Sequence, residues 1–362
     1  MQGTHAAPSG AIPVWYTYCH LLDAGTVDEE LGCVAEELGE HGAELKYFLS
    51  APGHDFYPHF THELESLFRF GGCIPPIHVK ADLVDTVLLG LQWIPEGGGL
   101  LVRAGEGIDE VADLRGRRIG LSRSLNRRKV DYRRVTDERG VEVVLGLHGL
   151  SRDDVELVDC ERADDWYDMP EARVPLAALT EFWSRYGIAP DLRHRPLLPE
   201  LEAGAIDACF VTDPFDLGYA DYQEFDLIGS LARHPDWTLQ VGGAPYALTC
   251  TRAFAERHPE LVTAYLTGLV RAGRRCGADP WATATLLETT GFFLAAGTLH
   301  EKIRSVDFVP NLSDENLAAL AIEKDFMLGH GYITHDVDVR EWAAPEFLAA
   351  AHRELDARPP SP

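Results

Sequence analysis

Two short segments hold the side chains of this sequence that are best suited to act on an anion. The first is His59-Phe60-Thr61-His62, and the second is Arg69-Phe70-Gly71-Gly72-Cys73, which runs into Ile74-Pro75-Pro76. An imidazole can exchange a proton near neutral pH, and a guanidinium can hold a planar anion with two parallel hydrogen bonds. The two glycines would let the backbone turn with φ > 0 and aim N–H groups at a ligand. A plain turn with a solvated arginine is the alternative interpretation.

The composition is that of a globular protein with a strong negative charge. The chain has 362 residues, of which 46% are hydrophobic, and this length favours two domains. Fifty-eight acidic residues against thirty-two Lys and Arg give a formal net charge of −26, which would repel a polyanion, so we expect no nucleic-acid partner. Residues 115–134 are locally basic; most of these cations are expected on a solvated face, although one or two could line a cleft.

The apolar segments give no sign of a membrane protein. The longest runs, such as residues 88–93, are far shorter than a bilayer span, so we expect no membrane partner. Residues 1–13 contain no Lys or Arg and no apolar run of the kind found in a secretory signal. We therefore expect a cytoplasmic protein, and we expect it to be a monomer.

The cysteines are scattered and lack the spacing of a zinc site, which predicts no metal: Cys19, Cys33, Cys73, Cys160, Cys209, Cys250 and Cys276. In a reducing compartment most of them should be small core residues. A reactive thiol needs an imidazole or a cation beside it to lower its pKa. Cys19, which precedes His20, and Cys73, which follows Gly72, are the two candidates; a buried structural thiol is the alternative for each.

The order of apolar segments predicts an α/β fold. Residues 14–18, 43–50 and 86–92 have the pattern of strands separated by helices, which is typical of a mostly parallel sheet. Ser122 and Ser124 follow a later strand, where α/β folds place ligand-binding loops, and helix capping is their alternative role. After the last strand the sequence becomes rich in helical patterns, which suggests that one domain is inserted into the other.

This order resembles the type II periplasmic binding fold. The resemblance is carried by Asp113-Leu-Arg-Gly-Arg-Arg-Ile-Gly120, Leu201-Glu-Ala-Gly-Ala-Ile-Asp-Ala208 and Arg257-His-Pro-Glu-Leu-Val-Thr-Ala-Tyr-Leu266, which are typical of its sulfonate and nitrate binders. It implies two α/β lobes joined by two crossovers, with a ligand held in the cleft between them.

The lobes implied by this resemblance can be placed on the sequence. We expect lobe I to comprise residues 10–112 and 246–355, the second segment being α-rich. Lobe II, the inserted lobe, would comprise residues 113–245. Residues 356–362 would form a disordered tail.

Three further segments resemble the 2'-hydroxybiphenyl-2-sulfinate desulfinase family, whose members use this fold. They are His59-Phe60-Thr61, Arg69-Phe70-Gly71-Gly72 with Ile74-Pro75-Pro76, and Trp342-Ala-Ala-Pro-Glu-Phe-Leu348. The resemblance implies hydrolytic release of sulfite from an aryl sulfinate without a cofactor. At the matched positions, His59 would be the catalytic histidine, Arg69 the sulfinate-binding guanidinium and Gly72 a backbone N–H donor.

The cysteine of this family follows the first strand in a Thr-Tyr-x-x-Cys context, as a nucleophile towards sulfur or as a proton donor to the ring carbon. Here Thr17-Tyr18 is followed at once by Cys19, two residues early. We expect Cys19 to be catalytic together with His59 and Arg69, and Cys73 is the second candidate. The remaining residues that we expect to contact the substrate come from both lobes: Gly71, Gly72, Cys73, His20, His62, Ser122 and Ser124.

Two other functions are compatible with these residues. A non-catalytic cytoplasmic protein could use Arg69 to clamp an oxyanion, and the early position of Cys19 motivates this alternative. A lyase or dehydratase of a biosynthetic pathway could use the same fold for different chemistry. Each of the three functions implies a small anionic ligand, either a sulfinate or a carboxylate.

Overall fold

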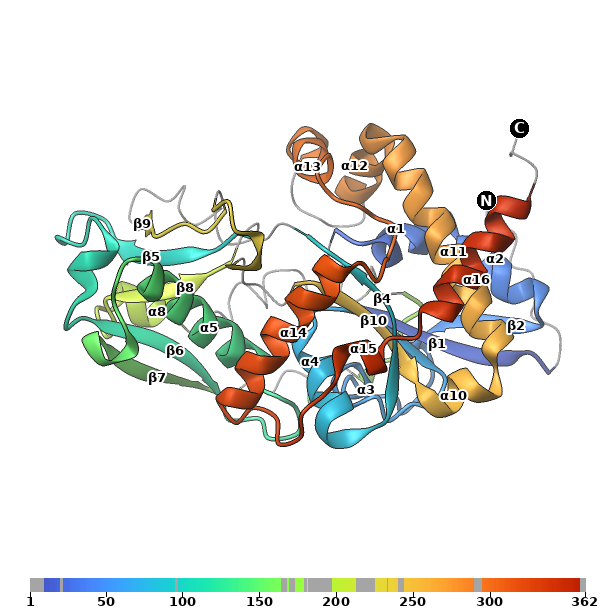
Figure 1. Ribbon diagram of the computed structural model, residues 1–362, viewed down its shortest axis with the longest axis horizontal. Helices are drawn as coiled ribbons and strands as arrows, with labels where there is room; N and C mark the ends of the chain where they lie inside the picture. Colours follow the sequence, from blue (N-terminus) through green and yellow to red (C-terminus); the bar gives the residue numbers. More distant parts are fainter. Residues whose placement is uncertain are drawn as a thin grey trace.

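The computed structural model describes residues 10–19, 22–94, 97–163, 168, 173–178, 181, 197–212, 225–232, 234–239, 244–289 and 295–358. Two five-stranded sheets form two lobes that lie side by side along the long axis of the molecule (Figure 1). The predicted two-lobed α/β architecture is confirmed. Among the described helices, none is long and apolar enough to cross a membrane.

The sheet of lobe I has the order β2-β1-β3-β10-β4. Its strands are β1 (Ile12–Tyr18), β2 (Ala43–Tyr47), β3 (Leu67–Gly71), β4 (Thr86–Gln92) and β10 (Tyr246–Thr251). β1 is parallel to both β2 and β3, whereas β10 lies antiparallel between β3 and β4. The carboxyl ends of β1 and β3 therefore meet at one edge of the sheet, which is where α/β folds bind their ligands.

The sheet of lobe II repeats this plan in the order β7-β6-β8-β5-β9. Its strands are β5 (Gly99–Arg103), β6 (Arg118–Ser124), β7 (Glu156–Arg162), β8 (Ala208–Val211) and β9 (Phe225–Ile228). β5 lies antiparallel between β8 and β9, as β10 does in lobe I. Each antiparallel strand is thus the first strand of its sheet after the chain has crossed from the other lobe.

Two predicted boundaries need correction. We placed residues up to 112 in lobe I, but β5 pairs within the second sheet, and Leu100 and Val111 lie in the core of lobe II. The first crossing therefore precedes Gly99. The tail was predicted from residue 356, but α16 (Pro345–Ala357) continues past it, and the Arg358 guanidinium donates two hydrogen bonds of 2.6 Å to Glu37.

Helices pack on both sheets, and some of them lie where the two lobes meet (Figure 1). They are α1 (Ala24–Leu31), α2 (Cys33–Glu40), α3 (Pro58–Thr61), α4 (Ile74–His78), α5 (Tyr132–Leu147), α8 (Leu197–Glu202), α10 (Arg252–Arg257), α11 (Pro259–Ala278), α12 (Pro280–Thr289), α13 (Ala296–Ile303), α14 (Asp314–Gly329), α15 (Val339–Trp342) and α16. In lobe I, α11 packs against α1, α2 and α16. In lobe II, α5 packs on β5, β6 and β8.

A shared apolar core joins the lobes on the side of α14. Leu88 of β4 and Leu320 of α14 pack in one cluster with Val135 of α5. Beside this cluster, Arg139 of α5 pairs with Glu323 of α14, with only 5% and 1% of these side chains exposed. A buried ion pair is costly to break because it would leave one charge unpaired in the interior. The lobes are therefore fastened to each other on this side.

Candidate active site

Cys19 and Gly71 lie side by side because β1 and β3 are parallel neighbours. Tyr18 pairs with Phe70 in the sheet, and the Cys19 N–H donates to the Phe70 carbonyl at 3.0 Å. A Cβ atom placed on Gly71 would lie 2.4 Å from Cys19 Sγ. Residue 71 must therefore be glycine if the thiol is to keep its place. Its φ of 159° is close to an ordinary extended value, so space rather than conformation requires the glycine.

Gly71→Ala should therefore displace the Cys19 thiol. We expect the variant to fold but to lose about tenfold or more of its activity, because a shift of about 1 Å at a reacting atom has effects of this size. Gly39→Ala is the matched control, since a Cβ there meets no atom within 4 Å. Turnover and the rate of Cys19 alkylation measure the effect. Unchanged values for both would show that the thiol does not depend on this contact.

His59 contacts Thr17 of β1 and Cys19, the residue that follows this strand. It belongs to the short helix α3, and its Nδ1 lies 2.8 Å from Thr17 Oγ1 while its Nε2 lies 3.7 Å from Cys19 Sγ. The second distance is within the range of a hydrogen bond to sulfur. Thr17 and Cys19 are two residues apart on an extended segment, so their side chains point to the same face. The structure thus places His59 beside Cys19.

Arg69 is buried, with 1% of its surface exposed, and it braces the site from β3. Its Nε donates to the His59 carbonyl at 3.1 Å, and its Nη1 donates to the Gly72 carbonyl at 2.8 Å. Within the described part of the chain, Nη2 meets no acceptor, and neither does the Gly72 N–H. A guanidinium N–H and a backbone N–H therefore remain available to an anion at this position.

The predicted turn at residues 69–76 is shorter than expected. Arg69, Phe70 and Gly71 are the last residues of β3, and only Gly72 and Cys73 separate this strand from α4. The prolines occupy the first turn of α4, where a missing N–H costs nothing.

Burial makes the imidazole of His59 neutral. Desolvation holds its pKa well below the usual range, and the nearby charge of Arg69 and the neighbouring His62 lower it further. Burial also lowers the pKa of Arg69, but a guanidinium stays protonated in proteins. The positive charge of the site therefore resides on Arg69, and His59 faces the Cys19 thiol as a neutral ring.

His62 was expected to contact the substrate, but the structure gives it a supporting role. It ends α3 in the left-handed region, with φ of 55°, and its Nε2 lies 2.9 Å from Thr249 Oγ1 of β10. The side chain is buried, and burial followed by the charge of Arg69 lowers its pKa to about 3. His62 thus anchors α3 to the sheet behind His59.

This buried histidine should make the protein sensitive to acid. Between pH 6.5 and pH 3 the unfolded chain binds a proton at His62 that the folded protein does not, so stability is lost as the pH falls. At pH 5, His62 accounts for a loss of about 2 kcal/mol in the free energy of unfolding. Asparagine tolerates the left-handed backbone, so His62→Asn is a suitable variant. In urea unfolding, its free energy of unfolding should fall less between pH 7 and pH 5 than that of the wild type. An equal loss in both proteins would contradict this prediction.

Cys73 and Ser122 were expected at the site, and the structure corrects both. Cys73 is fully buried in the shared apolar core, and this burial raises the pKa of its thiol well above the usual range. Ser122 is also buried, and both its N–H and its hydroxyl donate to Asp137. Each side chain therefore serves packing or local hydrogen bonding. His20 lies outside the described residues.

Ser124 supports a loop of lobe II that docks on α3. Its hydroxyl accepts the Asn126 N–H at 3.2 Å, and the Asn126 side-chain amide donates to the hydroxyl of Tyr57 at 2.8 Å. Tyr132 stacks on Phe60, with ring centroids 5.8 Å apart. Asn126 and Tyr132 of lobe II thus contact α3, the helix that carries His59, and the residue before it. Neither of them was singled out from the sequence.

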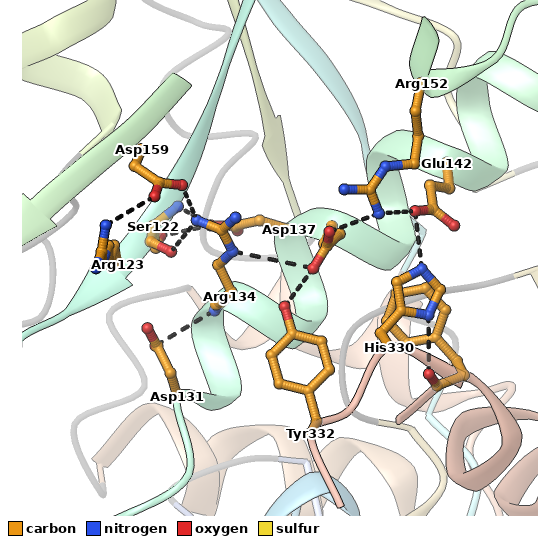
Figure 2. A network of polar contacts seen from close by, with 12 residues as sticks. Ser122, Arg123, Asp131, Arg134, Asp137, Glu142, Arg152, Asp159, His330 and Tyr332 are labelled. Atoms are coloured by element: carbon orange, nitrogen blue, oxygen red, sulfur yellow. Dashed lines mark hydrogen bonds and ion pairs between the residues drawn. The ribbon is translucent and has the colours of Figure 1, made fainter. Parts of the chain in front are cut away.

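One group of side chains has the composition of a metal site, although it lies at the lobe junction. The ligand atoms of Glu138, Glu142 and His330 lie within 4.8 Å of one another. Figure 2 shows Arg152 pointing into this group, and its Nη1 lies 2.7 Å from Glu138 Oε1 and 2.6 Å from Glu142 Oε1. Because a guanidinium already neutralises the carboxylates, this group is an ion-pair cluster that links α5 to the segment after α14.

The chain is similar in sequence and fold to known desulfinases. The chain is 29% identical over 319 residues to 2'-hydroxybiphenyl-2-sulfinate desulfinases of Rhodococcus erythropolis and Rhodococcus qingshengii, covering 80% of this chain and 82% of each relative. It superposes on the crystal structure of a Cys-to-Ser mutant of the desulfurization enzyme DszB in complex with biphenyl-2-sulfinic acid, with a TM-score of 0.68 and 22% identity over 94% of this chain and 99% of that one. The expected resemblance is confirmed.

Periplasmic binding proteins are also among the similar structures. A periplasmic sulfonate-binding protein from Methylobacillus flagellatus KT superposes with a TM-score of 0.67 and 16% identity, over 96% of this chain and 95% of that one. The fold is therefore that of the type II periplasmic binding proteins. No protein-family model matches the chain.

Proposed function

We propose that this protein is a desulfinase that cleaves the carbon–sulfur bond of a small aromatic sulfinate and releases sulfite. The observation that carries the proposal is the meeting of Cys19, His59 and Arg69 at one sheet edge. A protein that only binds an anion needs Arg69, but it has no use for a thiol held against an imidazole. The similarity to the Rhodococcus desulfinases along most of the chain supports the same function.

The sulfinate group would bind to Arg69 and Gly72. A sulfinate is a compact anion with two oxygens, and the Nη2 of Arg69 and the N–H of Gly72 offer it hydrogen-bond donors. The rings of Phe56 and Phe60 flank His59, with centroids 5.6 Å and 4.9 Å from the imidazole. Both rings are buried, and they hold the imidazole of His59 in place.

The reaction requires a proton and a water molecule. Cys19 would give its thiol proton to the ring carbon that bears the sulfur; the carbon–sulfur bond then breaks, and its electron pair returns to the ring. Sulfur dioxide leaves and takes up water to give hydrogen sulfite and a proton, which restores the thiol. No electron acceptor is needed, because the electron pair of the carbon–sulfur bond stays on the ring carbon, where the proton binds it, and the later addition of water to sulfur dioxide transfers no electrons.

We favour proton donation over attack of the thiolate on sulfur for two reasons. A thiolate would approach a group that already carries a negative charge. The ring carbon would also still need a proton, and His59, whose pKa is held far below the usual range, does not carry an extra one near neutral pH. The thiol is the acid that stands at the right place.

Sulfite release from a panel of aryl and alkyl sulfinates tests the proposal. We expect equal amounts of sulfite and of the desulfinated arene, and faster release from aryl than from alkyl substrates. Thermal stabilisation by these compounds without any sulfite would instead identify an oxyanion-binding protein. An aryl carboxylate that is turned over while the sulfinates are not would point to a lyase. The cytoplasmic location and the monomeric state also remain proposals.

A further inference from the structure

The hydrogen bonds around His59 restrict where its ring proton can lie. A neutral imidazole carries one N–H, so one ring nitrogen donates and the other accepts. Thr17 Oγ1 faces Nδ1 at 2.8 Å, and Cys19 Sγ faces Nε2 at 3.7 Å. Both partners can donate or accept, and two arrangements of the protons are therefore conceivable.

Thr17 decides between these arrangements. Its side chain is 1% exposed, and within the described part of the chain its hydroxyl has one hydrogen-bond partner, the Nδ1 of His59. If Nδ1 carried the proton, the Thr17 O–H would be a buried donor without an acceptor, which is unfavourable. If Thr17 donates to Nδ1, the proton lies on Nε2 and is directed at Cys19. In this second arrangement both the Thr17 O–H and the His59 N–H have an acceptor.

We infer that Thr17 is a positioning residue that holds the His59 proton on Nε2, so that His59 donates a hydrogen bond to the sulfur of Cys19 and does not act as a base. The inference rests on the proposed function for its catalytic consequence. As Cys19 transfers its proton to the ring carbon, negative charge develops on the sulfur. The N–H of His59 would stabilise that charge, and a neutral imidazole is sufficient for this purpose.

The charged and titratable groups around His59 agree with this role. Arg69 faces it from β3, His62 from α3 and Cys19 from the end of β1. The positive charge of Arg69 opposes a second proton on the ring. It also favours negative charge on the neighbouring sulfur.

Thr17→Val and Thr17→Ser separate this role from simple packing. Valine keeps the shape of threonine but lacks the hydroxyl, whereas serine keeps the donor. We expect Thr17→Val to lower turnover about tenfold and to raise the midpoint of Cys19 alkylation by about one pH unit, which is the usual size of one lost hydrogen bond to a charged group. Thr17→Ser should remain close to the wild type in both measurements.

Two readouts do not require a sulfinate. Alkylation of the native protein should report on Cys19, because the other six cysteines are buried. The ¹⁵N spectrum of histidine-labelled protein, with His59 assigned from a His59→Gln variant, gives the tautomer directly and should show the proton on Nε2. A proton on Nδ1 in the wild type would overturn the inference, as would an unchanged alkylation profile in Thr17→Val. If the alkylation profile and the tautomer agree with the inference but no sulfinate is cleaved, the inference about Thr17 holds and the proposed function is wrong.

Discussion

Cys19→Ser should abolish sulfite release while the protein still binds an aryl sulfinate. A serine hydroxyl is a far weaker acid than a thiol, so it cannot protonate the ring carbon, and we expect turnover to fall by about 1,000-fold or more. Serine nearly preserves the shape of the side chain next to Gly71, so the binding groups on Arg69 and Gly72 stay in place. Turnover is measured as sulfite released, and binding is measured by calorimetry.

Cys160→Ser is the control for this experiment. Cys160 is a buried cysteine in the core of lobe II, on the other sheet. Its variant should release sulfite at nearly the wild-type rate. The crystal structure of a Cys-to-Ser mutant of DszB with biphenyl-2-sulfinic acid shows that such a substitution is compatible with sulfinate binding in that enzyme. Full activity of Cys19→Ser would exclude Cys19 as the proton donor.

Arg69→Met should weaken sulfinate binding by about 100-fold or more. The substitution removes the positive charge of Arg69 and the hydrogen bonds that a guanidinium gives, which together are worth about 3 kcal/mol. It also removes the hydrogen bonds from Arg69 to the carbonyls of His59 and Gly72. Equilibrium binding is best measured in the Cys19→Ser background, where the substrate is not consumed, and a circular dichroism spectrum checks the fold.

Arg69→Lys distinguishes charge from geometry. A lysine keeps the positive charge but cannot donate to His59, to Gly72 and to a ligand in one plane. We expect its affinity to lie between those of the parent and of Arg69→Met. If Arg69→Met binds the sulfinate as tightly as its parent, the anion must be held elsewhere, and the basic residues of the loop at 123–134 would be the next to test.

The sequence was sufficient to predict the site where short motifs follow strands. Cys19 follows β1, and Arg69 and Gly71 lie at the end of β3. The carboxyl ends of these neighbouring parallel strands meet, so the thiol and the end of β3 come together. Thr17 could have been found in the same way, since residues i and i+2 of a strand share a face. The contact of Thr17 with His59 could not be predicted, because the approach of α3 to β1 is a tertiary contact.

Other residues could not be placed because their surroundings depend on distant parts of the chain. Cys73 looks reactive next to Gly72, but α14 and α15 supply the apolar side chains that bury it. The apolar run of β5 would fit either sheet, and only its pairing with β8 and β9 assigns it to lobe II. The pairing of Arg139 with Glu323 joins residues 184 positions apart, and no local pattern indicates it.

The place of β10 between β3 and β4 has a consequence for biosynthesis. Thr249 of β10 pairs with Arg69 in the sheet and contacts His62 through its hydroxyl, so the catalytic centre is incomplete until this strand has been made. All of lobe II is translated between β4 and β10. At ordinary rates of translation, β3 and β4 expose open edges for roughly 10 to 40 seconds. A nascent chain of this protein would therefore need protection from aggregation by chaperones or by the early folding of lobe II.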